Sequence, residues 1–495
     1  MKDVVLGIDA STTAVKVLAF TREGAELAHG KRGYPLSNPL PGHFEQDPED
    51  WWQALIHALK DVSASVDPTR IAALSIAHQR ETFTLIDQAG EALIPAILWL
   101  DERARPQVAK LSEEIGAGTI RDWSGKPPDP TPALYGLAWL HEHDRKSLND
   151  AAWLVDVHGF LVHRLTGENV TSVASADPLG LIDMMQRNWH GRLVAAAGLR
   201  ADQLQKLTKP SEVCGFIRED IAGITGLLAG TPVVAGAGDG QAAGLGMGVV
   251  APQSAYLSLG SGVVSGMYAE KFLSANAFRT LTAPGQSGYM METVLRSGMQ
   301  LVDWIVRTTN AGPVEKLEAE ATKIQAGSGG LMVLPYWSGV MNPYWDEAAR
   351  GAILGLSLDH KPAHLFRAVL EGIALEQAIA TDALEKVVGH RAKTMTAAGG
   401  GIKSKLLMQI LASALNRPLQ LSPANEAAAL GAAMLAAIGA GWFKTSQEAS
   451  KAMGGNPSDH VEPFPQLVSF YSRQKEIYRG LHFATREING KLQGL

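Results

Sequence analysis

A carboxylate followed by a hydroxyl-rich turn opens the chain. Asp9 ends the apolar run VVLGI, which is typical of a strand buried on both faces, and Ser11, Thr12 and Thr13 follow it. Consecutive backbone N–H groups in a tight turn can bind an anion, and Lys16 would add positive charge. A carboxylate beside bound phosphates can hold hydrated Mg²⁺. The alternative is an ordinary β-turn in which Asp9 only accepts hydrogen bonds from the backbone.

A second turn of the same kind lies near the middle of the chain. The strand pattern SAYLSL leads into Gly260, Ser261 and Gly262, and the strand pattern VVSGMY follows. Either turn alone is most simply an ordinary turn, but a pair that opens two halves of a chain favours phosphate groups held between them. The repeat predicts two domains, residues 1–249 and 250–495, with a cleft between them where a small molecule would bind.

Two glycine-rich segments mark further strand ends. Asp239 stands where the strand pattern TPVVAGAG meets a helix, and there its carboxylate would be open to a substrate hydroxyl. It could accept the hydroxyl proton as the general base of a phosphoryl transfer, or serve only as the N-cap of the helix, and spacing does not decide between these roles. Gly399, Gly400 and Gly401 lie between another strand and a helix, where bare backbone lets a flat ring or a ribose approach.

The segment HQRET lies between two apolar strand patterns. Its Arg80 and Glu81 bring five N–H donors and a carboxylate acceptor side by side, which together can hold neighbouring hydroxyls of a polyol. The alternative is a salt bridge at the surface, where such pairs contribute little.

Composition and missing motifs exclude several classes of protein. The 495 residues are 46% hydrophobic and 19% charged with a net charge of -6, which fits a globular protein and argues against a nucleic-acid partner. The single cysteine, Cys214, fits a reducing cytoplasm, where we expect the protein. The apolar run 427–443 is shorter than the ~20 residues of a membrane span, so we expect a buried helix and no membrane partner. P-loop, GxGxxG, GxSxG and HExxH motifs are absent from the sequence.

The elements that would position these residues follow from periodicity. Strand patterns occupy residues 4–8, 15–20, 71–76, 82–86, 254–259 and 263–268, and helical spacing occupies residues 50–59, 363–378 and 404–415. Asp47 and Pro48 form a start signal just before the first of these helices. The pattern predicts an α/β fold.

These segments together resemble the FGGY carbohydrate kinases of the actin/hexokinase superfamily. The resemblance covers essentially the whole chain and is most specific at residues 351–371, where GAILGL, seven further residues and HLFRAVLE fit the family's C-terminal signature. It implies two similar RNase H-like domains of the actin/hexokinase/Hsp70 type with an interdomain cleft. It also implies transfer of the γ-phosphate of ATP to a hydroxyl of a sugar or polyol.

The resemblance assigns roles to individual residues. Asp239 would be the catalytic base, and Asp9 and Asp239 would support Mg²⁺. The nucleotide would be held by Ser11, Thr12, Thr13, Lys16, Gly260, Ser261, Gly262, Gly399, Gly400, Gly401 and Ser404. The substrate would be held by Gln79, Arg80, Glu81, Trp99, Asp101 and Gln241.

The substrate itself is harder to predict, because the sequence mixes two subfamilies. EQDPEDWW, PAILW and PVVAGAGD resemble xylulokinases, whereas the loop QRET is similar to that of glycerol kinases. We expect a ketopentose such as xylulose; the alternative is glycerol or another short polyol such as erythritol or ribitol, and ribulose and gluconate stay open. An alternative of a different class is a non-catalytic ATP or sugar sensor on the same fold. A homodimer is one assembly that we consider.

Overall fold

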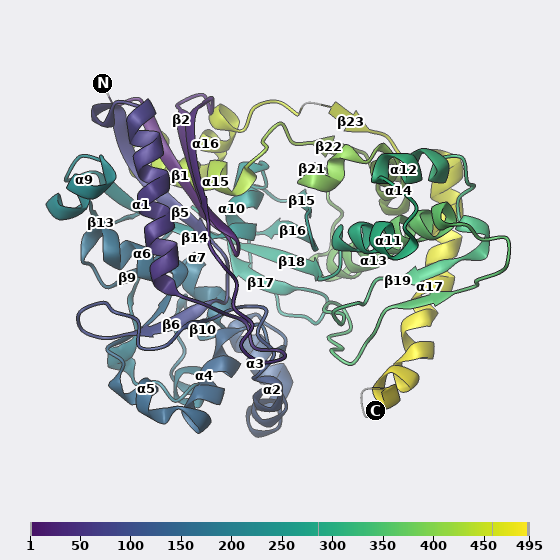
Figure 1. The fold of residues 1–495 in the computed structure, drawn as a ribbon, viewed down its shortest axis with the longest axis horizontal. Helices are drawn as coiled ribbons and strands as arrows, with labels where there is room; N and C mark the ends of the chain where they lie inside the picture. The colour runs from purple at the N-terminus through teal and green to yellow at the C-terminus, as the bar shows by residue number, and fades with distance from the viewer. Residues whose placement is uncertain (1, 286, 458, 493–495) are drawn as a thin grey trace.

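Two central sheets lie side by side in the computed structural model, which describes residues 2–285, 287–457 and 459–492. The first half of the chain, purple to blue in Figure 1, forms the left part of the view, and most of the second half, green to yellow, forms the right part. The first sheet has the order β13 (Val213–Phe216), β14 (Pro232–Gly238), β5 (Ile71–His78), β1 (Val4–Ala10), β2 (Ala14–Thr21) and β3 (Glu26–Gly33). The second has the order β17 (Arg279–Thr282), β18 (Tyr289–Leu295), β16 (Val263–Ala269), β15 (Ser254–Leu259), β21 (Thr394–Ala398), β22 (Leu419–Leu421) and β23 (Asp459–Val461).

The two sheets repeat one plan. In the first sheet, β1 pairs antiparallel with β2 and parallel with β5, and β5 pairs parallel with β14. In the second sheet, β15 pairs antiparallel with β16 and parallel with β21, and β21 pairs parallel with β22. The internal duplication expected from the two strand–turn–strand units is therefore present in the sheets, and the α/β prediction is confirmed.

Helices of the first half surround the first sheet and a smaller sheet of order β4 (Glu45–Gln46), β7 (Ala96–Ile97), β6 (Phe83–Ile86) and β8 (Trp153–Asp156). Two short pairs accompany them: β10 (Ile182–Asp183) with β11 (Asn188–Trp189), and β9 (Val170–Ser172) with β12 (Lys206–Thr208). The helices are α1 (Pro48–Ser65), α2 (Arg105–Leu111), α3 (Ala117–Ser124), α4 (Ala133–His143), α5 (Arg145–Asp150), α6 (Val157–Thr166), α7 (Val173–Ala176), α8 (Gly191–Ala196), α9 (Glu219–Thr225) and α10 (Asp239–Gly246).

The helix α1 begins where the start signal places it. Asp47 is its N-cap and accepts a hydrogen bond from the backbone N–H of Glu49, while Pro48 occupies the first helical turn, where no intrahelical donor is needed. Its buried face, which includes Trp51 and Leu55, joins the core that also contains β1 and β5 side chains. Burial of this apolar stripe holds α1 against the sheet.

The second half contributes the remaining elements. Its helices are α11 (Gln300–Thr309), α12 (Val314–Ala321), α13 (Pro362–Val388), α14 (Lys405–Leu415), α15 (Ala427–Gly439), α16 (Ser446–Met453) and α17 (Pro465–Leu492), and β19 (Met332–Leu334) pairs with β20 (Ala352–Leu354). The two helices predicted at 363–378 and 404–415 are α13 and α14. Among the described residues, no helix combines the length and the apolar character that a membrane span requires.

Most of the apolar run 427–443 forms the buried helix α15 (Ala427–Gly439), which returns to the first half and packs on the first sheet (Figure 1). Its approach is so close that a Cβ on Gly7 of β1 would lie 1.9 Å from the carbonyl oxygen of Ala429. A Cβ on Gly431 would lie equally close, at 1.9 Å, to the carbonyl oxygen of Ala242 in α10. Only glycine allows this crossing of α10 and α15, and the crossing joins the two halves.

Candidate active site

Three neighbouring parallel strands of the first sheet end at one edge and bring the predicted residues together. Asp9 of β1 lies opposite Ala77 of β5, and Gly238 of β14 lies opposite His78 of β5. Asp9, the loop 79–82 and Asp239 therefore emerge side by side at the carboxyl ends of these strands. This edge is where α/β sheets bind their ligands.

Asp239 is the first residue of α10 rather than its cap, because Gly238 occupies the N-cap position. Its side chain is 40% exposed, and its Oδ1 accepts a hydrogen bond of 2.7 Å from the Gly240 backbone N–H and lies 3.0 Å from Arg80 Nε. Its Oδ2 has no hydrogen-bonding partner in the described part of the chain. One carboxylate oxygen is thus fixed, and the other is left to accept a proton.

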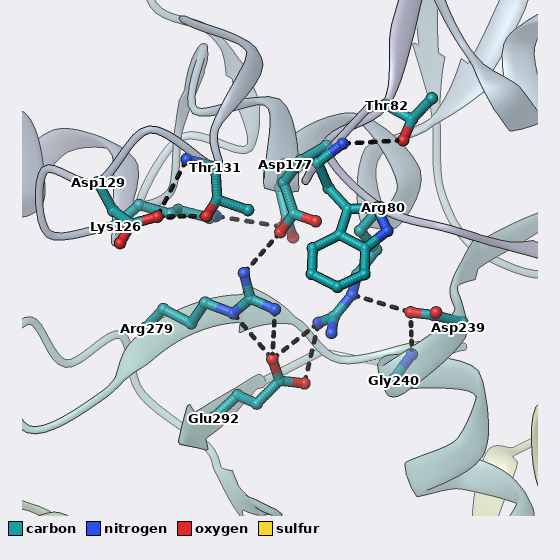
Figure 2. Close-up of polar contacts among 12 residues, drawn as sticks. Arg80, Thr82, Lys126, Asp129, Thr131, Asp177, Asp239, Gly240, Arg279 and Glu292 are labelled. Atoms are coloured by element: carbon teal, nitrogen blue, oxygen red, sulfur yellow. Dashed lines mark hydrogen bonds and ion pairs between the residues drawn. The ribbon is translucent and has the colours of Figure 1, made fainter. Parts of the chain in front are cut away.

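Arg80 and Glu81 do not form a surface salt bridge; both are buried and pair with the second half of the molecule. Figure 2 shows Arg80 directed toward Glu292. Arg80 Nη1 lies 2.9 Å from both oxygens of Glu292 on β18. Glu81 accepts a hydrogen bond of 2.6 Å from Arg279 on β17, and Arg279 Nε also reaches Glu292 at 2.8 Å. Two guanidinium groups and two carboxylates thus form one network across the two halves.

Glu292 is the centre of this network. Its side chain has no exposed surface, and besides the two arginines it accepts a hydrogen bond of 2.8 Å from the Tyr256 hydroxyl. Burial alone would raise its pKa, but the Arg80 and Arg279 guanidinium groups hold the pKa of this carboxyl below its usual value. Glu292 therefore stays ionised and fixes Arg80 against Asp239.

Glu81 is held in a conformation that non-glycine residues seldom adopt. Its φ is 60°, in the left-handed region, and its side chain is buried. Burial raises the pKa of Glu81, while the neighbouring Arg279 and Arg80 oppose that rise. Backbone strain of this kind is maintained only where the surroundings fix the residue, and the ion pair to Arg279 does so here.

The glycines around Asp239 make room for Arg80. A Cβ on Gly238 would lie 2.4 Å from Arg80 Cδ, and a Cβ on Gly240 would lie 2.9 Å from Arg80 Nη2. Both positions are closer than side-chain atoms can approach. The sequence pattern assigned these glycines to substrate access; the structure shows that they also admit the Arg80 side chain.

Three predicted substrate residues form hydrogen bonds within the protein. Gln79 donates to Gln46 Oε1 at 2.9 Å, and Gln241 donates to the carbonyl oxygen of Ala174 at 2.8 Å. Asp101 accepts from the Phe44 backbone N–H at 2.7 Å and from Arg103 Nε at 2.8 Å. All three side chains are almost fully buried. In this structure these bonds hold the loops around the site in position.

Trp99 links the loop 79–82 to the hydroxyl-rich turn 11–13. Its indole Nε1 donates a hydrogen bond of 3.0 Å to Thr12 Oγ1, and its backbone N–H donates one of 3.3 Å to Thr82 Oγ1. The Thr12 carbonyl accepts a further bond of 2.6 Å from Gln46 Nε2. Ser11 Oγ donates to the carbonyl of Ala14 at 3.0 Å and so closes the turn. Thr13, beside them, is exposed.

The environment of Asp9 fits the predicted Mg²⁺ site. Its Oδ1 is buried and has no hydrogen-bonding partner among the described residues. Burial raises the pKa of Asp9 to about 7; the Lys16 ammonium opposes this rise, and the carboxylates of Asp239 and Glu426 add to it. An unsatisfied carboxylate next to a second one at Asp239 is a suitable donor set for a hydrated divalent cation.

Lys16 joins the two halves at the same point. Its Nζ lies 3.7 Å from Asp9 Oδ2 and 2.5 Å from Oε2 of Glu426, the residue that precedes α15. The predicted phosphate-binding cation is therefore already paired with carboxylates of both halves, so phosphate groups would compete with Glu426 for it.

The second sheet brings the other glycine segments together at its own carboxyl edge. Ser258 of β15 lies opposite Ala398 of β21, so residues 260–262 and 399–401 emerge next to each other. A Cβ on Gly399 would lie 2.7 Å from the carbonyl oxygen of Leu259. Ser404 caps α14 by accepting from the Leu407 N–H at 3.1 Å. The turn 260–262, the glycines 399–401 and Ser404, which are the second half's share of the predicted nucleotide site, are thus adjacent in space.

Residues 298–299 belong to this edge and were not predicted. The Gly298 N–H donates to the carbonyl of Ser261 at 2.8 Å, and the Met299 N–H donates to that of Gly260 at 3.0 Å. These bonds fix the turn 260–262 against the start of α11. A Gly-Met pair before a helix carries no chemical signal of its own in the sequence.

Charged residues of the second half were also missed, although a signal for them existed. Arg279 and Glu292 lie in otherwise apolar or uncharged strand patterns, FRTLT and YMMETVL, where a charge must be paired if it is buried. Lys126 and Asp177 form a further buried pair, 3.2 Å apart, near the same network (Figure 2). Burial lowers the pKa of Lys126, and Asp177 opposes this shift.

Comparison with known proteins agrees with this geometry. The family model for the N-terminal domain of the FGGY family of carbohydrate kinases matches residues 4–246, and the model for the C-terminal domain matches residues 255–440. A xylulose kinase of Escherichia coli is 30% identical over 96% of this chain and 98% of its own length. A glycerol kinase of Thermococcus kodakarensis is 31% identical over 90% of each chain. The solved structure of a xylulose kinase from Rhodospirillum rubrum has a TM-score of 0.91 with 26% identity and covers 98% of this chain and 99% of its own.

The chain belongs to the FGGY family of carbohydrate kinases. It is a phosphotransferase that acts on a sugar or polyol, and ATP is the phosphate donor of the family. Its two-domain α/β structure is the actin/hexokinase-like fold of these kinases.

Proposed function

We propose that this chain is an Mg²⁺-dependent kinase that transfers the γ-phosphate of ATP to a hydroxyl of a ketopentose such as xylulose. The observation that carries the proposal is Asp239, whose Oδ1 is fixed by Arg80 and Gly240 and whose Oδ2 has no partner among the described residues. A substrate hydroxyl at Oδ2 would lose its proton to the carboxylate as it attacks the γ-phosphate. Arg80 carries a permanent positive charge beside the carboxylate and keeps it oriented for that step.

The substrate would lie between Arg80, Glu81 and Trp99 of the first half and the Arg279–Glu292 pair of the second. These charged groups are already paired with one another, so their positions are fixed. Substrate hydroxyls could form hydrogen bonds with them, and no unpaired charge would have to lose its water. The full-length similarity to xylulose kinases supports a ketopentose.

The nucleotide would lie along the opposite side of the cleft. Thr12 and Thr13, Lys16 and the turn 260–262 would hold the phosphates, and Gly400 and Gly401 would lie beside the adenosine. Mg²⁺ held by Asp9 and Asp239 would neutralise negative charge on the β- and γ-phosphates. Enclosure of both substrates between the halves would keep water from accepting the phosphate.

Glycerol is the second candidate, because the Arg80–Glu81 loop has the QRET sequence that is similar to glycerol kinases and because a glycerol kinase matches the chain at 31% identity. In that case the buried Glu81 would accept a hydrogen bond from a terminal hydroxyl. Comparing D-xylulose with glycerol as acceptors distinguishes the two.

The test is ADP release from MgATP with D-xylulose by the wild type and by Asp239→Asn. We expect the variant to lose about 10²–10⁴-fold in kcat while its affinity for ATP changes little, since a general base contributes that much. Asp220→Asn, at an exposed carboxylate far from the site, serves as a control and should leave kcat unchanged. Full turnover by Asp239→Asn would contradict the assignment.

A further inference from the structure

A recess lies in the second half, apart from the residues assigned to either substrate. It has a volume of about 680 Å³ and is lined by the segment that follows α12, by the start of α13 and by the α17 residues Phe470 to Ile477. Figure 1 shows α12 and α17 at the end of the molecule opposite α1. Nothing in the proposed phosphoryl transfer uses this recess.

The charges that line the recess are positive and unpaired. Lys323 and Arg473 both line it, and neither side chain has an ion-pair or hydrogen-bonding partner within the described ranges. No aspartate or glutamate of the described chain lines it. On the same helix, Lys475 and Arg479 both pair with Asp382, at 2.6 and 3.0 Å. Cations are thus neutralised elsewhere along α17 and left available at the recess, which favours an anionic occupant.

Two further side chains offer hydrogen bonds. Gln474 is 6% exposed, lines the recess, and its Oε1 is buried without a partner in the described part of the chain. Buried amide oxygens are almost always satisfied, so this one calls for a donor such as a ligand hydroxyl. His364 also lines the recess; its Nδ1 accepts a hydrogen bond from the Lys361 backbone N–H, so the proton lies on Nε2, which is left to donate.

The wall of the recess is pre-formed. Residues 327–330 all have positive φ, from 50° to 92°, and Ser328 is the one non-glycine residue among them. Glu371 fixes this loop by accepting from the Gly327 N–H and the Ser328 hydroxyl, both at 2.9 Å, and is itself held by Arg367 at 2.9 Å. Glycine adopts this backbone conformation without strain, whereas for Ser328 it carries a cost in free energy, and such a cost is retained where the conformation serves a site.

The recess also has an apolar wall, which could contact the carbon skeleton of a ligand. Phe470 and Ile477 line the side formed by α17, and Phe470 packs against Gly327, where a Cβ would lie 2.5 Å from the ring. A ring or carbon chain would cover these side chains while its anionic group reaches Lys323 and Arg473. From these features together we propose that the recess binds a small organic phosphate that carries hydroxyl groups, such as a sugar phosphate or a nucleoside monophosphate.

The recess is connected to the nucleotide side of the cleft through α12. Its lining segment begins directly after α12, and Glu318 of α12 accepts hydrogen bonds from Ser404 Oγ at 2.8 Å and from the Leu406 N–H at 3.1 Å. Ser404 and Leu406 lie at the start of α14, just after the glycines 399–401. An occupant that contacts the segment after α12 would act through α12 on the elements beside the adenosine. This consequence rests on the proposed function, whereas binding itself does not.

The test is calorimetric titration of the full chain with glucose 6-phosphate, AMP, inorganic phosphate and glucose. We expect glucose 6-phosphate, AMP or both to bind, and Arg473→Glu or Lys323→Glu to weaken that binding at least about tenfold, since each removes a charged hydrogen bond. Both positions are exposed, so these variants keep the fold. Lys60→Glu, at an exposed lysine of α1, changes the net charge by the same amount and should leave the affinity unchanged.

Each outcome is decisive for the recess. If Arg473→Glu and Lys323→Glu weaken the binding of glucose 6-phosphate but not that of AMP, the recess is a sugar-phosphate site. If they weaken only the binding of AMP, it is a nucleoside-phosphate site. Both results support the proposal. The proposal would be overturned if glucose 6-phosphate and AMP bound equally well to the wild type, Arg473→Glu and Lys323→Glu, or if neither bound to the wild type. Glucose binding that is as sensitive to Arg473→Glu as that of its phosphate would also overturn it. Because no turnover is measured, a chain that phosphorylates none of the tested sugars still answers this question.

Discussion

The two halves of the molecule build the same sheet and use its carboxyl edge differently. In the first half the strand ends carry Asp9, Arg80, Glu81 and Asp239, all ionisable. In the second half the corresponding edge carries glycines and a serine at 260–262 and 399–401, with Gly298 and Met299 beside them, and none of these residues is charged. One scaffold therefore carries ionisable side chains on one side and bare backbone on the other, an arrangement that suits the proposed transfer between a hydroxyl and a nucleotide.

The second half supplies charge to the cleft from a different place. Arg279 and Glu292 lie within β17 and β18, at the far edge of the sheet from β21 and β22, and reach across to Arg80 and Glu81. The charged edge of the first half is thus oriented by the second. Substitutions can therefore alter the charged groups that face the sugar and the glycines proposed to face the nucleotide separately, and their kinetic effects can be compared.

The largest effect is expected at Glu292. Glu292→Gln removes the charge that holds Arg80 and Arg279, so Arg80 loses its orientation against Asp239. We expect kcat/KM for the sugar to fall about 100-fold, the cost of misplacing a reacting group, with KM for ATP almost unchanged. Steady-state kinetics with each substrate varied in turn measures this split.

Glu371→Gln is the matched control for that variant. Glu371 is also a buried carboxylate of the second half held by an arginine and a tyrosine hydroxyl, Arg367 and Tyr471, but it lies away from the cleft. Loss of either buried charge should lower the free energy of unfolding by about 3–5 kcal/mol. Only Glu292→Gln should change the sugar kinetics; equal kinetic effects would show that the network acts through stability alone.

A smaller kinetic effect is expected from a substitution at Gly400, at the carboxyl edge of the second sheet. A Cβ added to Gly400 would have no described atom within 4 Å, so Gly400→Ala fits the free protein. If adenosine lies there, the methyl group would raise KM for ATP about tenfold and leave KM for the sugar unchanged, because overpacking costs about 1–3 kcal/mol. Gly480→Ala, at an equally open helical glycine of α17, should change neither KM. An unchanged KM for ATP in Gly400→Ala would contradict the placement of the adenosine beside Gly400.

The last effect is on stability rather than on kinetics, and its size depends on pH. Burial raises the pKa of Asp9 to about 7, above its value of ~3.9 in the unfolded chain. The folded protein therefore binds the extra proton between these values, and the free energy of unfolding falls as pH rises from about 4 to about 7. Asp9→Asn removes this cost, so in the absence of ligands it should be more stable than the wild type at pH 8, by at most about 4 kcal/mol, with a smaller advantage at pH 5.

Urea denaturation at both pH values measures this difference. Asp67→Asn provides a comparison of opposite sign, because the Thr69 N–H lowers the pKa of the exposed Asp67 and stabilises its charged form. Its loss of stability should be larger at pH 8 than at low pH. A difference between Asp9→Asn and the wild type that is the same at pH 5 and pH 8 would contradict the raised pKa.

Much of the fold was predictable, because strong local patterns specify it. The runs at 4–8 and 254–259 are β1 and β15, the helix start at Asp47 and Pro48 is α1, and the apolar run at 427–443 is buried α15. What local patterns could not show is that α15 leaves its own half to pack on β1, since that contact depends on Gly7 meeting Ala429 far away in the sequence.

The site was predictable only where chemistry and a strand end coincide. Asp9 and Asp239 meet that condition, and the strands β1 and β14 bring them to one edge. Arg279 and Glu292 do not, because they lie inside strands and act through tertiary pairing with Arg80 and Glu81. The sequence also placed Asp101 in the substrate site. In the structure its carboxylate accepts hydrogen bonds from Phe44 and Arg103, and its role toward a substrate stays a prediction.

The sharpest test of the proposed phosphoryl transfer is ADP release from MgATP by the wild type with a panel of acceptors. The panel holds D- and L-xylulose, D- and L-ribulose, glycerol, erythritol, ribitol and gluconate. We expect that one of them, D-xylulose first and glycerol second, raises turnover far above the rate without acceptor. Binding of ATP with no acceptor raising that rate would contradict the proposal and favour a sensor built on the same fold.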